Sequence, residues 1–446
     1  MDKSVLKDIE RDYLRAWYTK NRTFKTNIPF GIDDYYTDSA RVNIYNTIKI
    51  NKNKKVTIEA TSLNHEPILN FYSEDGTLAV FTDKNVIEYQ KVYQNKKLIL
   101  INKDTSNYKV LVLLEDGFWR IRHLVKMESE KKEKVKDLKP LVSVKKNEIF
   151  VDGKPFIIKG INYYPQATPW NMFGDEFDEK IIGNDFKIIK ESGLNCVRIF
   201  IQYEDFGKAK VTKEKLDKLK KVLDLAVIYK LKVVVTLFDF YGDYTVLNWT
   251  LTHRHAEQIV TTFKNHKAIL AWDVKNEADL DFKSRKKEVV LAWSSQIMLE
   301  IRKVNTNHLV TIGWSSMEAA ANLKDEVDVV SYHYYQNINN FETNFKQLKK
   351  EISNKPLVLQ EYGVSSYRGL WNPFGYSEKD QAAYHKKMQA IFKKDSLAFM
   401  SWSLYDFKVI PTSVAGNFPW RKNKQKHFGF IDVQGNLKPS FLYISH

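Results

Sequence analysis

The sequence predicts an α/β fold, a (β/α)8 barrel preceded by a smaller α+β domain. Three observations support this prediction. After residue 140, strand-like apolar runs alternate eight times with helical segments; a charged stretch precedes them; and the first part of the chain has helical spacing followed by strand-like runs. Strands that alternate with helices predict a parallel sheet with crossover connections.

Residues 1–126 are expected to form the smaller domain. Val5, Ile9 and Trp17 belong to an apolar set at helical spacing, and from Val56 onward the chain turns to strand-like runs separated by turn signals. The order predicts helices that precede a sheet.

Residues 127–140 are expected to be a linker. The stretch reads Met-Glu-Ser-Glu-Lys-Lys-Glu-Lys-Val-Lys-Asp-Leu-Lys-Pro, which is too poor in apolar residues to pack on both sides. Residues 141–446 then form the barrel domain, and their number fits the usual size of that fold.

The eight predicted strands of the barrel are apolar runs that follow one another in chain order. They cover 156–163, 195–201, 232–238, 269–274, 308–314, 327–332, 356–359 and 397–401. Apolar residues spaced by three and four predict helices between them, at 178–192, 212–229, 253–266, 284–304 and 377–394.

Composition limits the class of protein. The 446 residues are 43% apolar and 13% aromatic, enough for packed cores in two or three domains. No apolar run approaches the roughly 18 residues that cross a bilayer, and the first residues lack the apolar core of a signal peptide.

The lone Cys196 has no disulfide partner and is expected in the core. The net charge of +16 comes from lysines spread along the chain and favours solubility, or else attraction to an acidic polymer.

Motifs for cofactors are missing from the sequence. It contains no G-x-G-x-x-G or P-loop, so neither a nucleotide cofactor nor nucleic acid is expected as a partner. His253-Arg254-His255 is too compressed for a helical metal-binding pair, and no Cys/His ligand set accompanies it. The prediction is therefore no cofactor and no metal.

Polar and aromatic residues end the predicted strands. In such barrels the active site lies at the carboxyl ends of the strands. Each of these residues by itself has a plain structural reading, as an ion pair, a helix cap or a core aromatic. Together on eight ordered strands they suit a sugar-binding site: Tyr163, Tyr164, Arg198, Asp239, Asn276, Glu277, Trp314, His333, Tyr335, Glu361 and Trp402.

On these residues the barrel resembles glycoside hydrolase clan A, the retaining β-glycosidases that include families 2 and 5. Asn276-Glu277 after the fourth strand matches the clan's acid/base pair, Glu361 after the seventh its nucleophile, and Arg198 after the second the arginine beside that nucleophile. One departure is that many members carry a histidine after the third strand, where this chain reads Leu-Phe-Asp-Phe-Tyr from 237 to 241.

The resemblance implies a role for each residue. Glu361 is the expected nucleophile, kept ionised by Arg198 and Tyr335, and Glu277 is the expected acid/base, with a pKa raised by burial and a negative neighbour. Asn276 is expected to bind the sugar's 2-hydroxyl. The remaining assignments are His333 as a supporting residue and Trp402, Tyr163, Asp239 and Trp314 as substrate-binding residues. Trp170, Trp249, Trp371 and Trp420, on expected loops, either stack further sugars or pin the loops.

The predicted function is hydrolysis of a neutral β-linked oligo- or polysaccharide, a β-glucan or β-mannan, through a covalent glycosyl-enzyme. Alternatives are transglycosylation by the same residues and a non-catalytic glycan-binding or scaffold protein. Because polysaccharides usually lie outside the cytoplasm, an extracytoplasmic location is expected despite the missing leader, with the cytoplasm as the alternative.

Short segments of the first domain resemble the nuclear-transport-factor-2-like cone fold. They are Trp17-Tyr18, residues 36–41 and residues 115–121. The fold carries no activity by itself, and His65 and His123 are read as structural residues or as the lining of a cone pocket.

Overall fold

The computed structural model describes all residues except 1–2, 128–140, 306, 370–371 and 446. Two compact units, residues 1–137 and 138–446, make up the chain. Most of the predicted linker lies outside the described residues, and the predicted domain boundaries stay predictions. In the part of the chain that is described, no helix is both long and apolar enough to cross a membrane.

The first unit consists of three helices and five strands. They are α1 (Lys3–Thr26), α2 (Ile32–Tyr35), α3 (Asp38–Asn53), β1 (Val56–Leu63), β2 (Glu66–Tyr72), β3 (Leu78–Gln94), β4 (Lys97–Glu115) and β5 (Phe118–Met127). The antiparallel sheet has the order β1-β3-β4-β5, and β2 pairs with β3. The α+β prediction is confirmed, whereas the likeness to the cone fold stays a prediction.

The core of this unit lies between α1, α3 and the sheet. Tyr13 and Trp17 of α1 pack against Phe81 and Tyr108 of the sheet. The helical spacing of the apolar residues in α1 therefore places one face of that helix on the sheet, as an amphipathic pattern requires.

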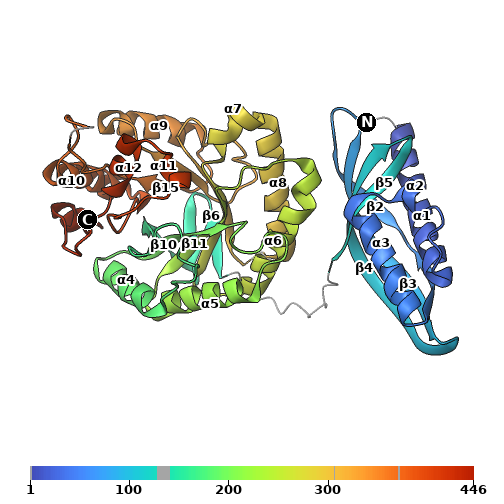
Figure 1. Cartoon of the computed structure of the whole chain (residues 1–446). Coiled ribbons are helices and arrows are strands. Elements are labelled where there is room, and N and C mark those ends of the chain that lie inside the picture. Colours follow the sequence, from blue (N-terminus) through green and yellow to red (C-terminus); the bar gives the residue numbers. More distant parts are fainter. Residues whose placement is uncertain (1–2, 128–140, 306, 370–371, 446) are drawn as a thin grey trace. The chain divides into compact units, whose positions relative to one another are not determined.

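The second unit contains the predicted closed barrel of eight parallel strands (Figure 1). The strands are β9 (Lys159–Asn162), β10 (Cys196–Gln202), β11 (Lys232–Asp239), β12 (Ile269–Asn276), β13 (Leu309–Trp314), β14 (Val330–Tyr334), β15 (Leu357–Tyr362) and β16 (Ala398–Ser401). β16 pairs with β9 and closes the barrel.

Helices surround these strands. The long ones are α4 (Glu179–Glu191), α5 (Lys213–Ile228), α6 (Trp249–Phe263), α8 (Lys287–Val304), α9 (Phe341–Glu351) and α10 (Glu378–Asp395). The short ones are α7 (Phe282–Arg285), α11 (Thr412–Ala415), α12 (Pro419–Lys426), η1 (Val246–Asn248), η2 (Ala278–Asp281), η3 (Ile338–Asn340) and η4 (Pro439–Tyr443). The helices α4, α5, α6, α8 and α10 were predicted from the sequence, whereas α9 and α12 were not.

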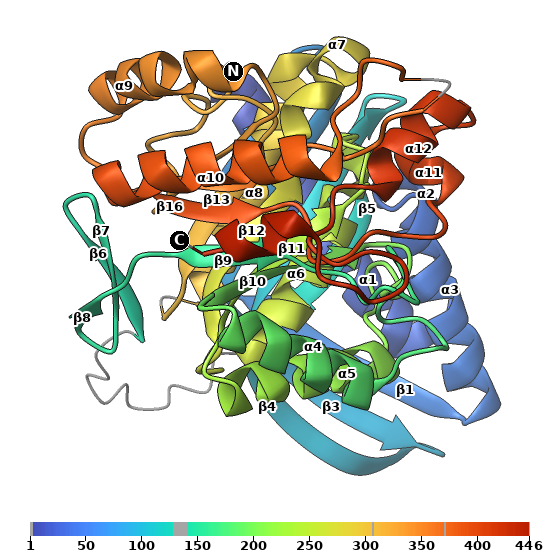
Figure 2. The ribbon, with the colours of Figure 1, turned by 90° about the vertical axis from the view of Figure 1, so that its left-hand side faces the viewer.

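A small sheet covers the amino-terminal end of the barrel. It consists of β6 (Val142–Lys145), β7 (Glu148–Val151) and β8 (Lys154–Pro155), and Figure 2 shows it at the edge of this unit. Val142 and Ile149 share a buried cluster with Cys196 and Leu270, which lie near the starts of barrel strands. Cys196 is thus a core residue, as expected, and the opposite end of the barrel is left for a site.

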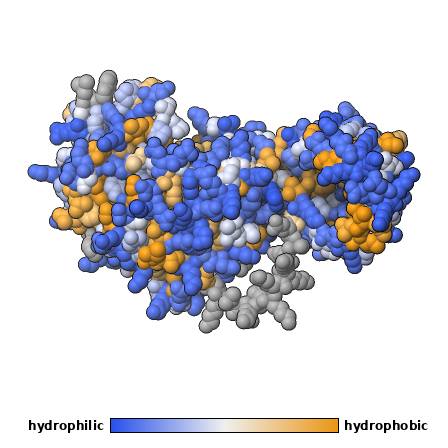
Figure 3. Space-filling model, turned by 60° about the horizontal axis from the view of Figure 1, so that its bottom comes forward, coloured by the Kyte–Doolittle hydropathy of each residue, from blue (hydrophilic) through white to orange (hydrophobic). Residues whose placement is uncertain are grey.

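The surface seen in Figure 3 is mainly hydrophilic, with separate hydrophobic patches. This agrees with a chain whose 70 Lys and Arg residues exceed its 54 Asp and Glu residues and are spread along its length.

Candidate active site

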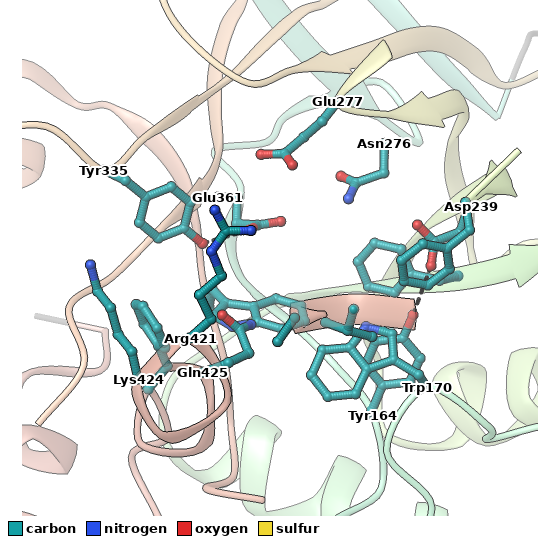
Figure 4. A pocket seen from close by; sticks show the side chains of 16 residues that line it. Tyr164, Trp170, Asp239, Asn276, Glu277, Tyr335, Glu361, Arg421, Lys424 and Gln425 are labelled. Atoms are coloured by element: carbon teal, nitrogen blue, oxygen red, sulfur yellow. Dashed lines mark hydrogen bonds between the residues drawn. The ribbon is translucent and has the colours of Figure 1, made fainter. Parts of the chain in front are cut away.

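A cavity of about 410 Å³ opens at the carboxyl ends of the barrel strands (Figure 4). Strand ends supply half of its lining, because parallel strands of a barrel all present their carboxyl ends to the same face. Loops and short helices after them supply the other half. The lining residues are Tyr164, Trp170, Phe200, Asp239, Phe240, Asn276, Glu277, Tyr335, Glu361, Trp402, Val414, Ala415, Arg421, Lys424, Gln425 and Phe428.

Arg198 of β10 lies fully buried beneath the cavity. Its Nη1 donates to Glu361 Oε2 at 3.3 Å, and its Nε and Nη2 donate to Asp273 Oδ2 at 3.0 and 2.6 Å. Its Nη2 also donates to Asn276 Oδ1 at 2.9 Å. A buried guanidinium is tolerated only when it is paired and hydrogen-bonded. Here the carboxylates of Asp273 and Glu361 and the amide of Asn276 accept its hydrogen bonds.

Asp273 was not singled out from the sequence. The available signal was a carboxylate inside the apolar run of β12, which is costly unless it has partners. Besides Arg198, it accepts from the Thr236 hydroxyl at 2.7 Å and the Gly313 N–H at 3.0 Å. It therefore fixes the arginine that touches Glu361.

Gly313 of β13 is required by close packing around this arginine. A Cβ at this position would lie 2.3 Å from Gln360 Oε1 and 3.0 Å from Arg198 Nη2. A side chain at this position would clash with the Gln360 amide and crowd the buried guanidinium, so the glycine keeps room for both.

Glu361, near the end of β15, is buried and receives two donors. The Tyr335 hydroxyl donates to Oε1 at 2.5 Å, and Arg198 donates to Oε2. Burial raises the pKa of Glu361, the nearby Glu277 raises it further, and the charges of His333 and Arg198 only partly offset this. The direction is opposite to the sequence-based expectation, because loss of water around this carboxyl outweighs its donors.

Glu277 follows β12 in a left-handed backbone conformation, φ 49° and ψ 48°. Such a conformation is uncommon for a residue other than glycine and is found at functional sites. Its N–H donates to the Gly313 carbonyl at 2.8 Å, which ties the turn to the next strand.

His333 of β14 contacts the Glu277 carboxyl. Its Nδ1 lies 2.9 Å from Glu277 Oε1 and 3.9 Å from Glu361 Oε2. Burial disfavours ionisation of Glu277, but the hydrogen bond and charge of His333 outweigh it and lower the pKa. Burial likewise lowers the pKa of His333, and the charges of Glu361 and Glu277 overcome this and raise it. The expected raised pKa of Glu277 is thus corrected, and the proton belongs to a coupled group of three side chains.

The same three residues also form a possible set of metal ligands. Glu277, His333 and Glu361 each offer one ligand atom, and these atoms lie within 4.8 Å of one another. Two carboxylates and an imidazole are common metal ligands. However, both oxygens of Glu361 already accept hydrogen bonds, one of them from the Arg198 cation, which would repel a metal ion. The donor set therefore fits proton transfer better.

Asp239 and Tyr164 form a second polar pair in the cavity. The Tyr164 hydroxyl donates to Asp239 Oδ2 at 3.1 Å, and burial raises the pKa of Asp239 to about 6. Tyr164 also stacks on Phe200 at 5.1 Å, and Trp170 lies 5.7 Å from Trp402. These rings give the cavity an aromatic floor, as sugar rings favour.

Two predicted substrate-binding residues lie elsewhere. The Tyr163 hydroxyl donates to Asp185 of α4 at 2.6 Å, and Trp314 is buried 6.0 Å from Phe282; neither lines the cavity. Adjacent residues of a strand point to opposite faces, so Tyr164 rather than Tyr163 faces the site.

The four tryptophans that were expected on loops differ in their locations. Trp170 lines the cavity, whereas Trp249 is buried in α6 and donates from Nε1 to the Tyr244 carbonyl at 3.0 Å. Trp420 stacks on Phe418 at 4.7 Å, and Trp371 lies outside the described residues. Sequence reasoning missed Arg421, Lys424 and Gln425 of α12, which line the cavity.

This barrel and its paired carboxylates define a glycoside hydrolase. The family described as cellulase, glycosyl hydrolase family 5, matches residues 151–408, and the chain belongs to it. The predicted resemblance to clan A is thereby confirmed.

Relatives with curated functions are more distant. The chain is similar to β-glucuronidase of Homo sapiens, 24% identical over 298 residues, and to that of Chlorocebus aethiops, 24% over 295 residues. These matches cover 62% of this chain but only 42% and 43% of the relatives, so the chain spans less than half of their length.

Solved structures show the same fold. The exo-β-1,4-mannosidase of Opitutaceae bacterium strain TAV5 has a TM-score of 0.54 at 19% identity and covers 65% of this chain and 59% of its own. Bacteroides uniformis β-glucuronidase 2 has a TM-score of 0.55 at 15% identity and covers 86% of this chain and 50% of its own.

Proposed function

We propose that this protein hydrolyses β-glycosides with retention of configuration, with Glu361 as nucleophile and Glu277 as acid and base. The observation that carries the proposal is the spacing of the two carboxylates: one oxygen of Glu277 and one oxygen of Glu361 lie within 4.8 Å of each other. Retaining enzymes hold these groups roughly 5 to 5.5 Å apart, whereas inverting enzymes leave room for a water between them.

The first step forms a glycosyl-enzyme. Glu361 attacks the anomeric carbon while the proton held by Glu277 and His333 passes to the departing oxygen. Arg198 and Tyr335 hold the attacking carboxylate in position. Burial raises the pKa of the Tyr335 hydroxyl well above its usual range, so it remains a donor.

The second step releases the sugar. Once Glu361 is esterified its negative charge is gone, and Glu277 takes a proton from the water that attacks the same carbon. Asn276 uses its oxygen to accept from Arg198, which leaves its amide N–H groups to bind a sugar hydroxyl in the cavity.

The test is nuclear magnetic resonance of the first product anomer from a set of β-glucan, β-mannan and xylan oligosaccharides. We expect the β anomer first, and loss of product in Glu361→Gln but not in the control Glu378→Gln, an exposed carboxylate of α10. The α anomer first, or full activity in Glu361→Gln, contradicts the proposal.

The same incubation separates the alternatives. Products longer than the substrate indicate transglycosylation, and glycan binding without any product indicates a binding module. Of the tryptophans expected on loops, Trp249 is buried in α6, so it is not placed to stack an acceptor sugar. The extracytoplasmic location stays a prediction, which fractionation of the producing cells checks.

A further inference from the structure

Three polar side chains of α12 reach the cavity from one face of that helix. Arg421, Lys424 and Gln425 are three and four residues apart, a spacing that places side chains on the same side of a helix. In Figure 4 they lie on the side of Tyr335 and Glu361, away from Asn276 and Asp239. The cavity therefore has a cationic side next to the nucleophile.

In the part of the chain that the structure describes, Arg421 and Lys424 have no acidic partner. Among the described residues, no Asp or Glu oxygen lies within 4.0 Å of a nitrogen of Arg421 or Lys424. The carboxylates of the cavity are already engaged, Glu361 by Arg198 and Tyr335 and Glu277 by His333. The charge of Arg421 and Lys424 is thus available to a ligand.

The sequence of α12 makes this arrangement unfavourable without an anion. The helix reads Pro-Trp-Arg-Lys-Asn-Lys-Gln-Lys and contains four cations and no acidic residue. Like charges three or four positions apart destabilise a helix, and an anion between them removes that repulsion.

Hydrogen bonds fix α12 to the loop that follows the nucleophile strand. The Ser365 hydroxyl donates to the Lys424 carbonyl at 2.6 Å, and the Ser366 N–H donates to the His427 carbonyl at 2.9 Å. The backbone of α12, from which the two cations extend, is therefore held by the fold next to the strand that carries Glu361.

We infer that the sugar whose bond is cleaved carries a carboxylate, as in a uronic acid, and that Arg421 and Lys424 bind it. The inference rests on the proposed glycosidase function and names its substrate class in place of the neutral glycan expected from sequence. Guanidinium groups match a planar carboxylate with two parallel hydrogen bonds, and the net charge of +16 favours approach of an acidic glycan.

The test compares kcat/KM for 4-nitrophenyl β-D-glucuronide and β-D-glucoside at pH 7. We expect the full-length protein to favour the glucuronide. Arg421→Gln and Lys424→Met each should lower its kcat/KM about 10- to 100-fold, mainly through KM, and leave the glucoside value nearly unchanged. The matched control is Lys422→Met on the same helix, because the Lys422 side chain binds the Thr412 hydroxyl and does not line the cavity.

A binding measurement keeps the inference separate from the proposed function. Calorimetry on the Glu361→Gln variant, with D-glucuronate and D-glucose as probes, should give binding of glucuronate that is lost in Arg421→Gln and weakened by salt. This result with no glycoside cleaved by the unmodified protein would overturn only the hydrolase proposal. Preference for the glucoside, equal losses on both substrates, or tighter binding of glucose 6-sulfate than of glucuronate overturns the carboxylate assignment.

Discussion

Each of the two units contains a histidine paired with a carboxylate, and the two pairs differ in how the carboxylate is satisfied. In the first unit, Asp83 is fully buried and accepts from His65 Nδ1 at 2.6 Å, the Tyr13 hydroxyl at 2.7 Å and the Glu66 N–H at 2.7 Å. In the barrel, His333 is the one described residue from which the Glu277 carboxylate accepts a hydrogen bond, and the Glu277 side chain is 25% exposed.

This difference separates a structural carboxylate from a reactive one. Three donors fix Asp83 and leave it little capacity for a new partner, whereas Glu277 keeps an oxygen free at a cavity and shares a proton with His333. A histidine next to an acid therefore does not by itself indicate a reactive site. The role of the carboxylate depends on how many other hydrogen bonds it already accepts.

The largest expected effect comes from Glu277→Gln. Loss of general acid and base catalysis should lower kcat roughly 10²- to 10⁴-fold on a substrate with a poorly departing group. Thermal unfolding should be nearly unchanged, because the amide still accepts from His333. The control is Glu204→Gln, an exposed carboxylate after β10 that should leave both quantities unchanged. If Glu277→Gln lowered the unfolding temperature but not kcat, Glu277 would be a structural carboxylate rather than a reactive one.

Asp83→Ala is expected to act on stability instead. It leaves the buried Tyr13 hydroxyl and the partly buried donors of His65 and Glu66 without this acceptor, and should cost about 3 to 5 kcal/mol of unfolding free energy. Calorimetry measures this cost, and kcat per folded molecule should not change. Asp75→Ala removes an exposed carboxylate of a turn in the same unit and should lower the unfolding free energy much less than Asp83→Ala. Equal costs for the two variants would contradict a structural role for Asp83.

A smaller effect is expected on the pH profile of kcat/KM in His333→Gln. Activity needs Glu361 ionised, so it is lost as pH falls through the raised pKa of that group. It also needs the shared proton, so it is lost as pH rises through the raised pKa of His333. Without His333, Glu361 loses a positive neighbour that lowers its pKa, and the proton is held by Glu277 alone. The pH range in which kcat/KM is high should therefore narrow at both its acidic and its basic limit. An unchanged range would contradict the sharing of a proton between Glu277 and His333.

The strand ends of the barrel could be predicted because each ends an apolar run with a polar residue. That pattern placed Asn276, Glu277 and Glu361 at one end of the barrel, where the structure has them. Arg198 was expected after the second strand but lies inside β10 and reaches Glu361 from beneath the cavity. It misplaced Tyr163, because a shift of one residue along a strand turns a side chain to the opposite face.

Helix α12 could not be predicted from the chain because its sequence is that of a solvated surface segment. Tertiary hydrogen bonds, among them those from Ser365 and Ser366, hold this helix beside the nucleophile strand. The pKa direction of Glu277 was mispredicted for a similar reason, since it depends on a 2.9 Å contact with His333 from another strand. The pKa of Glu361 was mispredicted because its burial, which raises the pKa, outweighs its donors.

The sequence by itself determined the two-part architecture, the barrel and its pair of catalytic-type glutamates, because apolar periodicity and strand-end chemistry are local properties of the chain. The tertiary structure alone decided which donors each carboxylate receives, how protons are shared and which charges face the cavity. Those properties depend on distances between residues far apart in the chain, and electrostatic and hydrogen-bond energies change steeply over such distances.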